Sequence, residues 1–98
     1  MPLFRTKREY FEWIKSGAKT IDLRRGKPKK GDVAVFLCGR EVLRKKIILK
    51  KTGKLEDILT EENYRQVVPN SKSITDAMER VRSLFGTTDG EFTAYQIG

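Results

Sequence analysis

The sequence contains no histidine and a single cysteine, Cys38. The missing histidine excludes the Ser-His and Cys-His nucleophile pairs and removes the commonest general base. One cysteine without histidine also makes zinc and other soft-metal sites unsuitable, so we expect no cofactor. Any catalysis would have to use lysine, carboxylate, hydroxyl or phenol groups. Cys38 ends an apolar run and is interpreted as a packing residue.

Long apolar runs are also missing, and none approaches the roughly 20 residues that a membrane-spanning helix needs. The opening segment 1–5 becomes charged too quickly for a signal peptide. A lone cysteine cannot form an internal disulfide. We therefore expect a cytoplasmic protein without a membrane partner, whose 98 residues form one domain, 1–98.

Charge is abundant but unevenly distributed. Up to Lys54 the chain has 17 Lys and Arg against 5 Asp and Glu, whereas the remainder has 4 against 8. A first half of +12 joined to a second half of −4 favours a polyanionic partner, namely RNA or a nucleotide, with DNA also possible. The alternatives are an ordinary solvated surface, or a protein-interaction domain whose acidic half, 61–85, docks a basic partner.

The first half predicts a helix followed by strands. Thr6 and Glu9 fit a capping box for a helix over 7–16, which Gly17 would end. Residues 19–24 alternate and predict a strand that is buried on one side only. After a basic loop, the continuous apolar run 33–38 predicts a strand buried on both faces. It leads into a second hairpin strand over 41–51.

The second half predicts mainly helices and a closing strand. Residues 55–59 suggest a short helical turn, and Thr60 begins a helix that ends before Pro69. Ser73 caps an amphipathic helix whose apolar period runs to Phe85. Residues 91–97 supply the last strand, with Phe92, Tyr95 and Ile97 as core candidates. Elements that do not alternate strictly favour an α+β fold with a mostly antiparallel sheet.

Three segments together resemble the ASCH domain family. Residues 14–24 (IKSGAKTIDLR) are similar to its signature, a helix end followed by a Gly-x-Lys strand that finishes in Arg. Gly31-Asp32 and the apolar strand after it fit the continuation. The segment 68–74, leading into the last helix, is similar to small archaeal stand-alone members. The resemblance extends from about Phe4 to Ile97.

This resemblance implies a PUA-like fold, a small mostly antiparallel β-barrel with about three flanking helices. It also implies a basic cleft beside the strand 19–24 that holds RNA or a nucleotide. Lys and Arg suit phosphate and base-edge contacts, while loop lysines extend the footprint along a backbone. The candidate nucleic-acid-binding residues are Lys19, Asp22, Arg24, Arg25, Lys27, Lys29 and Lys30.

The resemblance also implies an alternative function, because some family members are amidohydrolases that deacetylate N4-acetylcytidine. Their site combines a Lys, a Thr three residues later and a Glu before the last helix. Lys19 matches the Lys, whereas Asp22 and Asn70 stand at the other two positions. Asp22 is expected to keep Lys19 charged, which opposes a nucleophilic role. An enzyme of this type, or a metal-independent ribonuclease, would have Lys19 and Asp22 at its centre.

Each candidate residue also has a purely structural interpretation. Lys19 and Arg24 could be exposed strand residues, with Asp22 as their ion-pair partner. Trp13 on the apolar side of the first helix is more typical of a core residue than of a stacking platform. In a regular strand Lys19 would point away from Asp22 and Arg24, unless the strand starts later or bulges.

Overall fold

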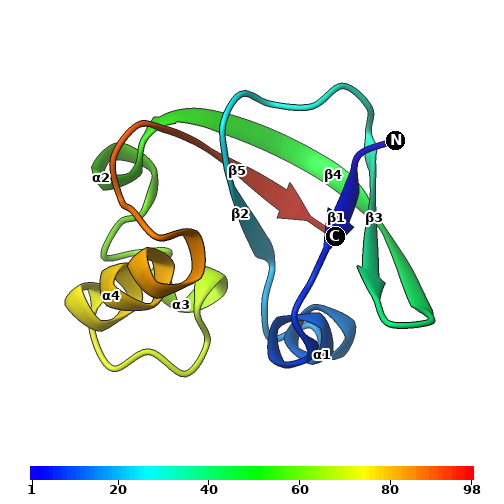
Figure 1. Ribbon diagram of the computed structural model, residues 1–98, viewed down its shortest axis with the longest axis horizontal. Coiled ribbons are helices and arrows are strands. Elements are labelled where there is room, and N and C mark those ends of the chain that lie inside the picture. Colours follow the sequence, from blue (N-terminus) through cyan, green and yellow to red (C-terminus); the bar gives the residue numbers. More distant parts are fainter.

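The computed structural model covers residues 1–98 and contains five strands and four helices. Figure 1 shows their arrangement, with three of the helices gathered on one side of a curled sheet. The elements, in chain order, are β1 (Leu3–Arg5), α1 (Arg8–Ser16), β2 (Ile21–Arg25), β3 (Val33–Cys38), β4 (Glu41–Lys54), α2 (Leu55–Ile58), α3 (Tyr64–Val67), α4 (Ile74–Phe85) and β5 (Glu91–Ile97). No helix is long and apolar enough to span a bilayer.

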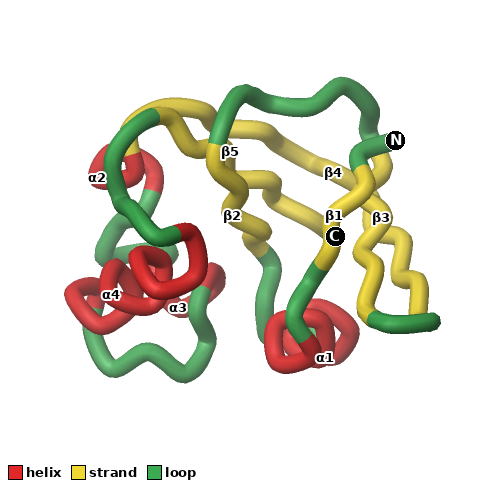
Figure 2. The backbone as a smooth tube through the Cα atoms, in the orientation of Figure 1, coloured by secondary structure: helices red, strands yellow, loops and turns green.

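The strands form one five-stranded sheet in the order β1-β3-β4-β5-β2. Only the β1–β3 pair is parallel. The 14-residue β4 pairs first with β3 and then with β5, and the register shifts between Ile47 and Leu49 where it changes partner. This irregularity lets the sheet curl into the half-barrel visible in Figure 2. The expected α+β fold with a mostly antiparallel sheet is confirmed, with four helices in place of about three.

The sheet separates two hydrophobic cores. Ile21, Leu23 and Phe92 pack on its outer face against α2, α3 and α4. Phe4, Phe36 and Tyr95 fill the inside of the curl together with Phe11 and Ile14 of α1. Both faces of β2 and β5 are therefore covered, each by a different part of the chain.

β2 differs from the expected one-sided strand. Asp22 is buried as completely as its neighbours Ile21 and Leu23, because it faces the inner core while they face the helices. The strand also begins at Ile21, so Lys19 precedes it and escapes the strand alternation. β1 was not predicted at all. It enters the sheet through backbone bonds from Val35 N to Pro2 O and from Thr6 N to Leu37 O.

The expected capping box of α1 is wrong. The N-cap is Lys7, with no side-chain cap, and the Thr6 hydroxyl donates to Phe4 O instead. Gly17 ends the helix at φ +88°, as predicted. The Ser73 cap is confirmed, since its hydroxyl accepts from Asp76 N at 3.1 Å.

The helix expected from Thr60 begins only at Tyr64. The Asn63 side chain explains the delay, because it accepts from Thr60 N and donates to Ile58 O. These two bonds stabilise a turn in place of the first helical turn. The predicted helical turn 55–59, the hairpin and the closing strand with its core residues are all confirmed.

Candidate functional site

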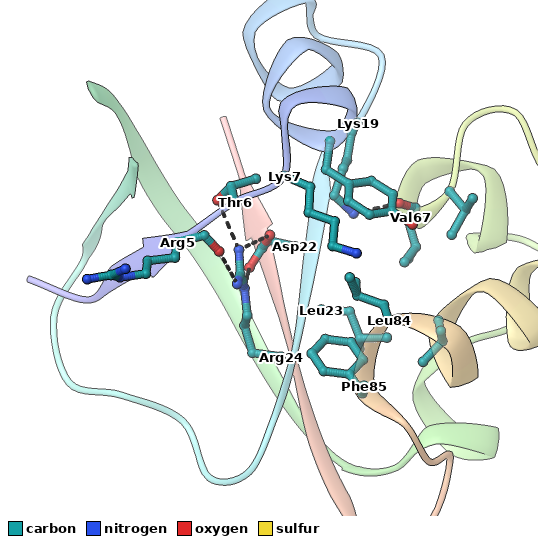
Figure 3. Close-up of a pocket in the computed structure, with 13 residues that line it drawn as sticks. Arg5, Thr6, Lys7, Lys19, Asp22, Leu23, Arg24, Val67, Leu84 and Phe85 are labelled. Carbon is teal, nitrogen blue, oxygen red and sulfur yellow. Dashed lines mark hydrogen bonds and ion pairs between the residues drawn. The ribbon is translucent and has the colours of Figure 1, made fainter. Parts of the chain in front are cut away.

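A pocket of about 180 Å³ opens beside β2, between the segment that joins β1 to α1 and the helices α3 and α4. Its polar wall comes from the first part of the chain and its apolar wall mainly from the last third (Figure 3). The polar wall consists of Arg5, Thr6, Lys7, Tyr10, Lys19, Asp22 and Arg24. The apolar wall consists of Leu23, Val67, Val68, Val81, Leu84 and Phe85.

Lys19 lies at the back of this pocket and is 6% exposed. Its Nζ donates to the backbone oxygens of Ile21 at 2.7 Å and Val67 at 2.5 Å. Burial lowers the pKa of Lys19 to about 8; Asp22 opposes the change and Arg24 reinforces it. Asp22 favours the charged form of this lysine, as expected, but the loss of hydration outweighs its attraction, so the pKa falls below the ordinary value.

Asp22 is instead occupied by Arg24 in a two-point ion pair. Arg24 Nε donates to Asp22 Oδ2 at 2.7 Å, and Arg24 Nη2 donates to Oδ1 at 3.2 Å. The same guanidinium donates to Arg5 O at 2.9 Å and to Thr6 Oγ1 at 3.2 Å, and it lies 4.6 Å from the centre of the Phe4 ring. Arg24 thus fastens the end of β1 to β2, and most of its donors are already used.

The other predicted basic residues lie outside the pocket lining. Arg25, Lys27, Lys29 and Lys30 are all exposed, on the end of β2 and the loop that follows it. Lys29 comes nearest, since its Nζ lies 5.2 Å from the Phe4 ring that also contacts Arg24. Its backbone N–H donates to the Tyr95 hydroxyl and anchors the loop over the inner core. The structure therefore brings together Lys19, Asp22 and Arg24, whereas the loop cations follow the opposite end of β2 from Lys19.

Known structures share this arrangement of strands and helices. Hypothetical protein PH0355 superposes with a TM-score of 0.79 at 25% identity, over 97% of this chain and 94% of that one. A mutant of ZmASCH from Zymomonas mobilis gives 0.72, and ASCH from the same organism gives 0.70. Both are 20% identical over 98% of this chain. The chain has the ASCH fold.

This chain spans about two thirds of the two Zymomonas ASCH chains, 66% and 65% of their lengths. No protein-family model matches the sequence, and no curated protein is similar to it in sequence. The ASCH resemblance seen in residues 14–24 is confirmed by the fold that this chain shares with the solved ASCH structures.

The ASCH signature positions are only partly brought together. Lys19 and Asp22 line one pocket. Asn70 is exposed, lies outside the pocket lining, and accepts from Arg80 Nη1 at 2.7 Å. No group of three or more His, Cys, Asp or Glu side chains is placed to hold a metal ion.

Sequence reasoning missed Arg5, Thr6, Lys7 and Tyr10, which complete the polar wall. In Figure 3 the Lys7 side chain reaches into the pocket, whereas the Arg5 side chain points away from Lys19. The Tyr10 ring centre lies 5.6 Å from Lys19 Nζ, and burial raises the pKa of its phenol. Their signal in the sequence is weak, because they precede or begin a helix whose polar face looks like ordinary surface.

Proposed function

We propose that this ASCH-fold chain binds RNA or a nucleotide and takes one base into the pocket beside β2. The observation that carries this proposal is the pairing of two unlike walls. Lys19, Lys7 and Arg24 provide hydrogen-bond donors on one side, and Leu84 and Phe85 provide an apolar surface opposite them. An unstacked base needs both, because its edge forms hydrogen bonds and its faces need an apolar or aromatic partner.

The size of the pocket supports a single base more than an extended ligand. Its volume of about 180 Å³ is below the roughly 300–1,000 Å³ typical of pockets for drug-sized molecules. A flat ring can enter while the attached sugar and phosphate remain outside. The ring edge would meet the Lys19 ammonium, which has used two of its three donors on backbone oxygens.

Exposed cations at the end of β2 and in the loop after it support contact with the phosphates. Arg25, Lys27 and Lys30 form no ion pair within the chain, so their charges are available to a polyanion. Single-stranded RNA is the preferred partner, because its bases are free to leave the stack. DNA is the second candidate. The single domain 1–98, the cytoplasmic location and the lack of a cofactor remain predictions.

The test is fluorescence anisotropy with labelled single-stranded RNA, the matching DNA and free nucleotides at low salt. Lys7→Ala should weaken binding about tenfold, as expected for a charge-assisted contact worth about 1.4 kcal/mol. Lys72→Ala makes the same charge change on the exposed loop before α4 and should leave affinity within twofold. Absence of binding to every one of these ligands, or equal effects of the two variants, would overturn the proposal.

A second candidate function is catalysis on a modified nucleoside or on RNA. It is favoured by one observation, the buried Lys19 amine whose pKa is about 8. Such an amine is partly neutral at neutral pH and can act as a base. Wild type and Lys19→Met should be incubated with N4-acetylcytidine and with labelled RNA. Turnover by the wild type that the variant lacks would support this candidate, and equal background in both would reject it.

A further inference from the structure

The Lys19 amine has an unusual set of partners. It donates to two backbone oxygens, those of Ile21 and Val67, and forms no ion pair with any carboxylate. A protonated amine has three donors, whereas a neutral amine has two donors and one lone pair. Two acceptors therefore satisfy a neutral amine completely. The fourth tetrahedral position of the nitrogen then carries the lone pair.

Burial of this nitrogen shifts the amine toward its neutral form. Asp22 and Arg24 face it from β2, but their charges are joined in their own ion pair. Tyr10 and Lys7 approach from α1 and the residue before it, while α3 and α4 contribute only apolar side chains to the pocket. With a pKa of about 8, about one fifth of the Lys19 amine is neutral at pH 7.4. For an ordinary lysine the fraction is about one in a thousand.

We propose that Lys19 is a carbonyl-reactive amine that captures a small anionic aldehyde in this pocket as an imine. The nitrogen lone pair forms a bond to the carbonyl carbon, and the π pair of the carbonyl moves to its oxygen. That oxygen takes up a proton as the nitrogen loses one, which gives a carbinolamine. The hydroxyl then leaves with a proton as water, and a C=N bond forms. One water is released, and no oxidant or reductant is needed.

The same backbone oxygens would stabilise the product. A protonated imine retains one N–H, which can continue to donate to Val67 O or Ile21 O. The hydrogen bond that remains holds the new C=N bond at the back of the pocket. Only one backbone acceptor is left without its donor by the reaction.

The walls of the pocket define the class of aldehyde. Leu84, Phe85 and Val81 favour an apolar or aromatic body. Lys7 reaches into the pocket without an ion-pair partner, so it favours a carboxylate or phosphate on that body (Figure 3). An aromatic aldehyde with one anionic group meets both requirements. This inference does not depend on RNA binding, because it concerns only the amine and the pocket.

The experiment is reductive trapping of the intact protein with 4-carboxybenzaldehyde and cyanoborohydride at pH 7.4. Cyanoborohydride delivers hydride to the imine carbon and leaves a stable secondary amine, which peptide mass mapping locates. Lys19 should be modified at least tenfold faster than Lys15, an exposed lysine at the end of α1. Benzaldehyde, which lacks the carboxylate, should label Lys19 several-fold more slowly, and Lys7→Ala should remove that difference.

Two controls keep the outcome decisive. Lys19→Met should lose the fast adduct while the slow labelling of other lysines continues, and circular dichroism checks that it folds. Trapping of wild-type protein does not depend on any variant folding. Labelling of Lys19 no faster than Lys15 would overturn the carbonyl-reactive amine. If benzaldehyde labels Lys19 as fast as 4-carboxybenzaldehyde does, the proposal that the pocket selects an anionic aldehyde is overturned.

Discussion

At the scale of single residues, Lys19 is defined by what it lacks. It is buried without a carboxylate of its own, since Asp22 is bound to Arg24. Its hydrogen bonds are to backbone oxygens, which carry only partial charges and cannot replace the hydration of a full charge. Folding therefore shifts the equilibrium of this amine toward its neutral form, which lowers its pKa relative to that of the unfolded chain.

This lowered pKa predicts a pH-dependent contribution to stability. The ordinary pKa of 10.5 applies to the unfolded chain and a value of about 8 to the folded one. Between these values the unfolded chain binds more protons, so the free energy of unfolding should increase as pH rises from about 8 to 10.5. The increase from Lys19 amounts to about 3 kcal/mol, at about 1.4 kcal/mol for each pH unit.

Urea unfolding at several pH values would measure this contribution. The wild-type free energy of unfolding minus that of Lys19→Met should grow over the stated range, because methionine does not titrate. Lys15→Met removes an exposed lysine from α1 and serves as the matched control. A constant difference for Lys19→Met would show that the folded lysine titrates normally.

The identity of the key residues could be read from the sequence, but their geometry could not. The ASCH-like pattern singled out Lys19, Asp22 and Arg24, and all three line the pocket. The burial of Lys19 depends on Val67, 48 positions away in the chain, and on β2 beginning only at Ile21. The alternation of residues along a strand predicts neither feature, because both arise from tertiary packing.

At the scale of elements, β1 depends on contacts outside itself. Three residues have no periodicity to detect, whereas α4 and β5 were predicted from long apolar patterns and the Ser73 cap. β1 is fixed by its parallel pairing with β3 and by Arg24, which binds Arg5 O and Thr6 Oγ1 from β2. The part of the polar wall formed by Arg5 and Thr6 is therefore positioned by this guanidinium together with the pairing to β3.

Removal of Arg24 should be costly. Arg24→Met leaves the buried Asp22 carboxylate, whose side chain is 4% exposed, without its partner. Loss of one member of a buried ion pair typically costs about 3 kcal/mol or more. Arg24→Lys should recover little of this, since an ammonium cannot reproduce the two-point contact. Thermal and urea unfolding would measure the loss, and hydrogen exchange should be faster at the Thr6 amide.

Arg25→Met is the matched control for this prediction. It removes the same charge from the next position of β2, where the side chain is exposed and forms no ion pair. Its effect should stay within about 0.5 kcal/mol. If both variants are destabilised equally, the Arg24 clamp is not what holds β1 in place.

At the scale of the whole molecule, the pocket lies at the junction of the two halves of the chain. Every charged lining residue comes from the basic half, and the apolar wall apart from Leu23 comes from the acidic half. Charge counting predicted the basic side of the site. It could not predict the opposite wall, because α3 and α4 reach the pocket only by packing on the outer face of the sheet.

The basic loop after β2 should add attraction without selectivity. Lys27, Lys29 and Lys30 are exposed and lie outside the pocket, so they would contact phosphates and not base edges. Replacing all three by alanine should weaken RNA binding equally for all sequences. On single strands the slope of log affinity against log salt should become less steep by about 2, at about 0.7 for each phosphate that the variant no longer neutralises.

Lys7→Ala should instead change the preference among bases, because Lys7 reaches into the pocket. Anisotropy titrations with homopolymeric RNAs at several salt concentrations would separate the two effects. An unchanged slope in the triple variant would mean that the RNA backbone does not cross this loop.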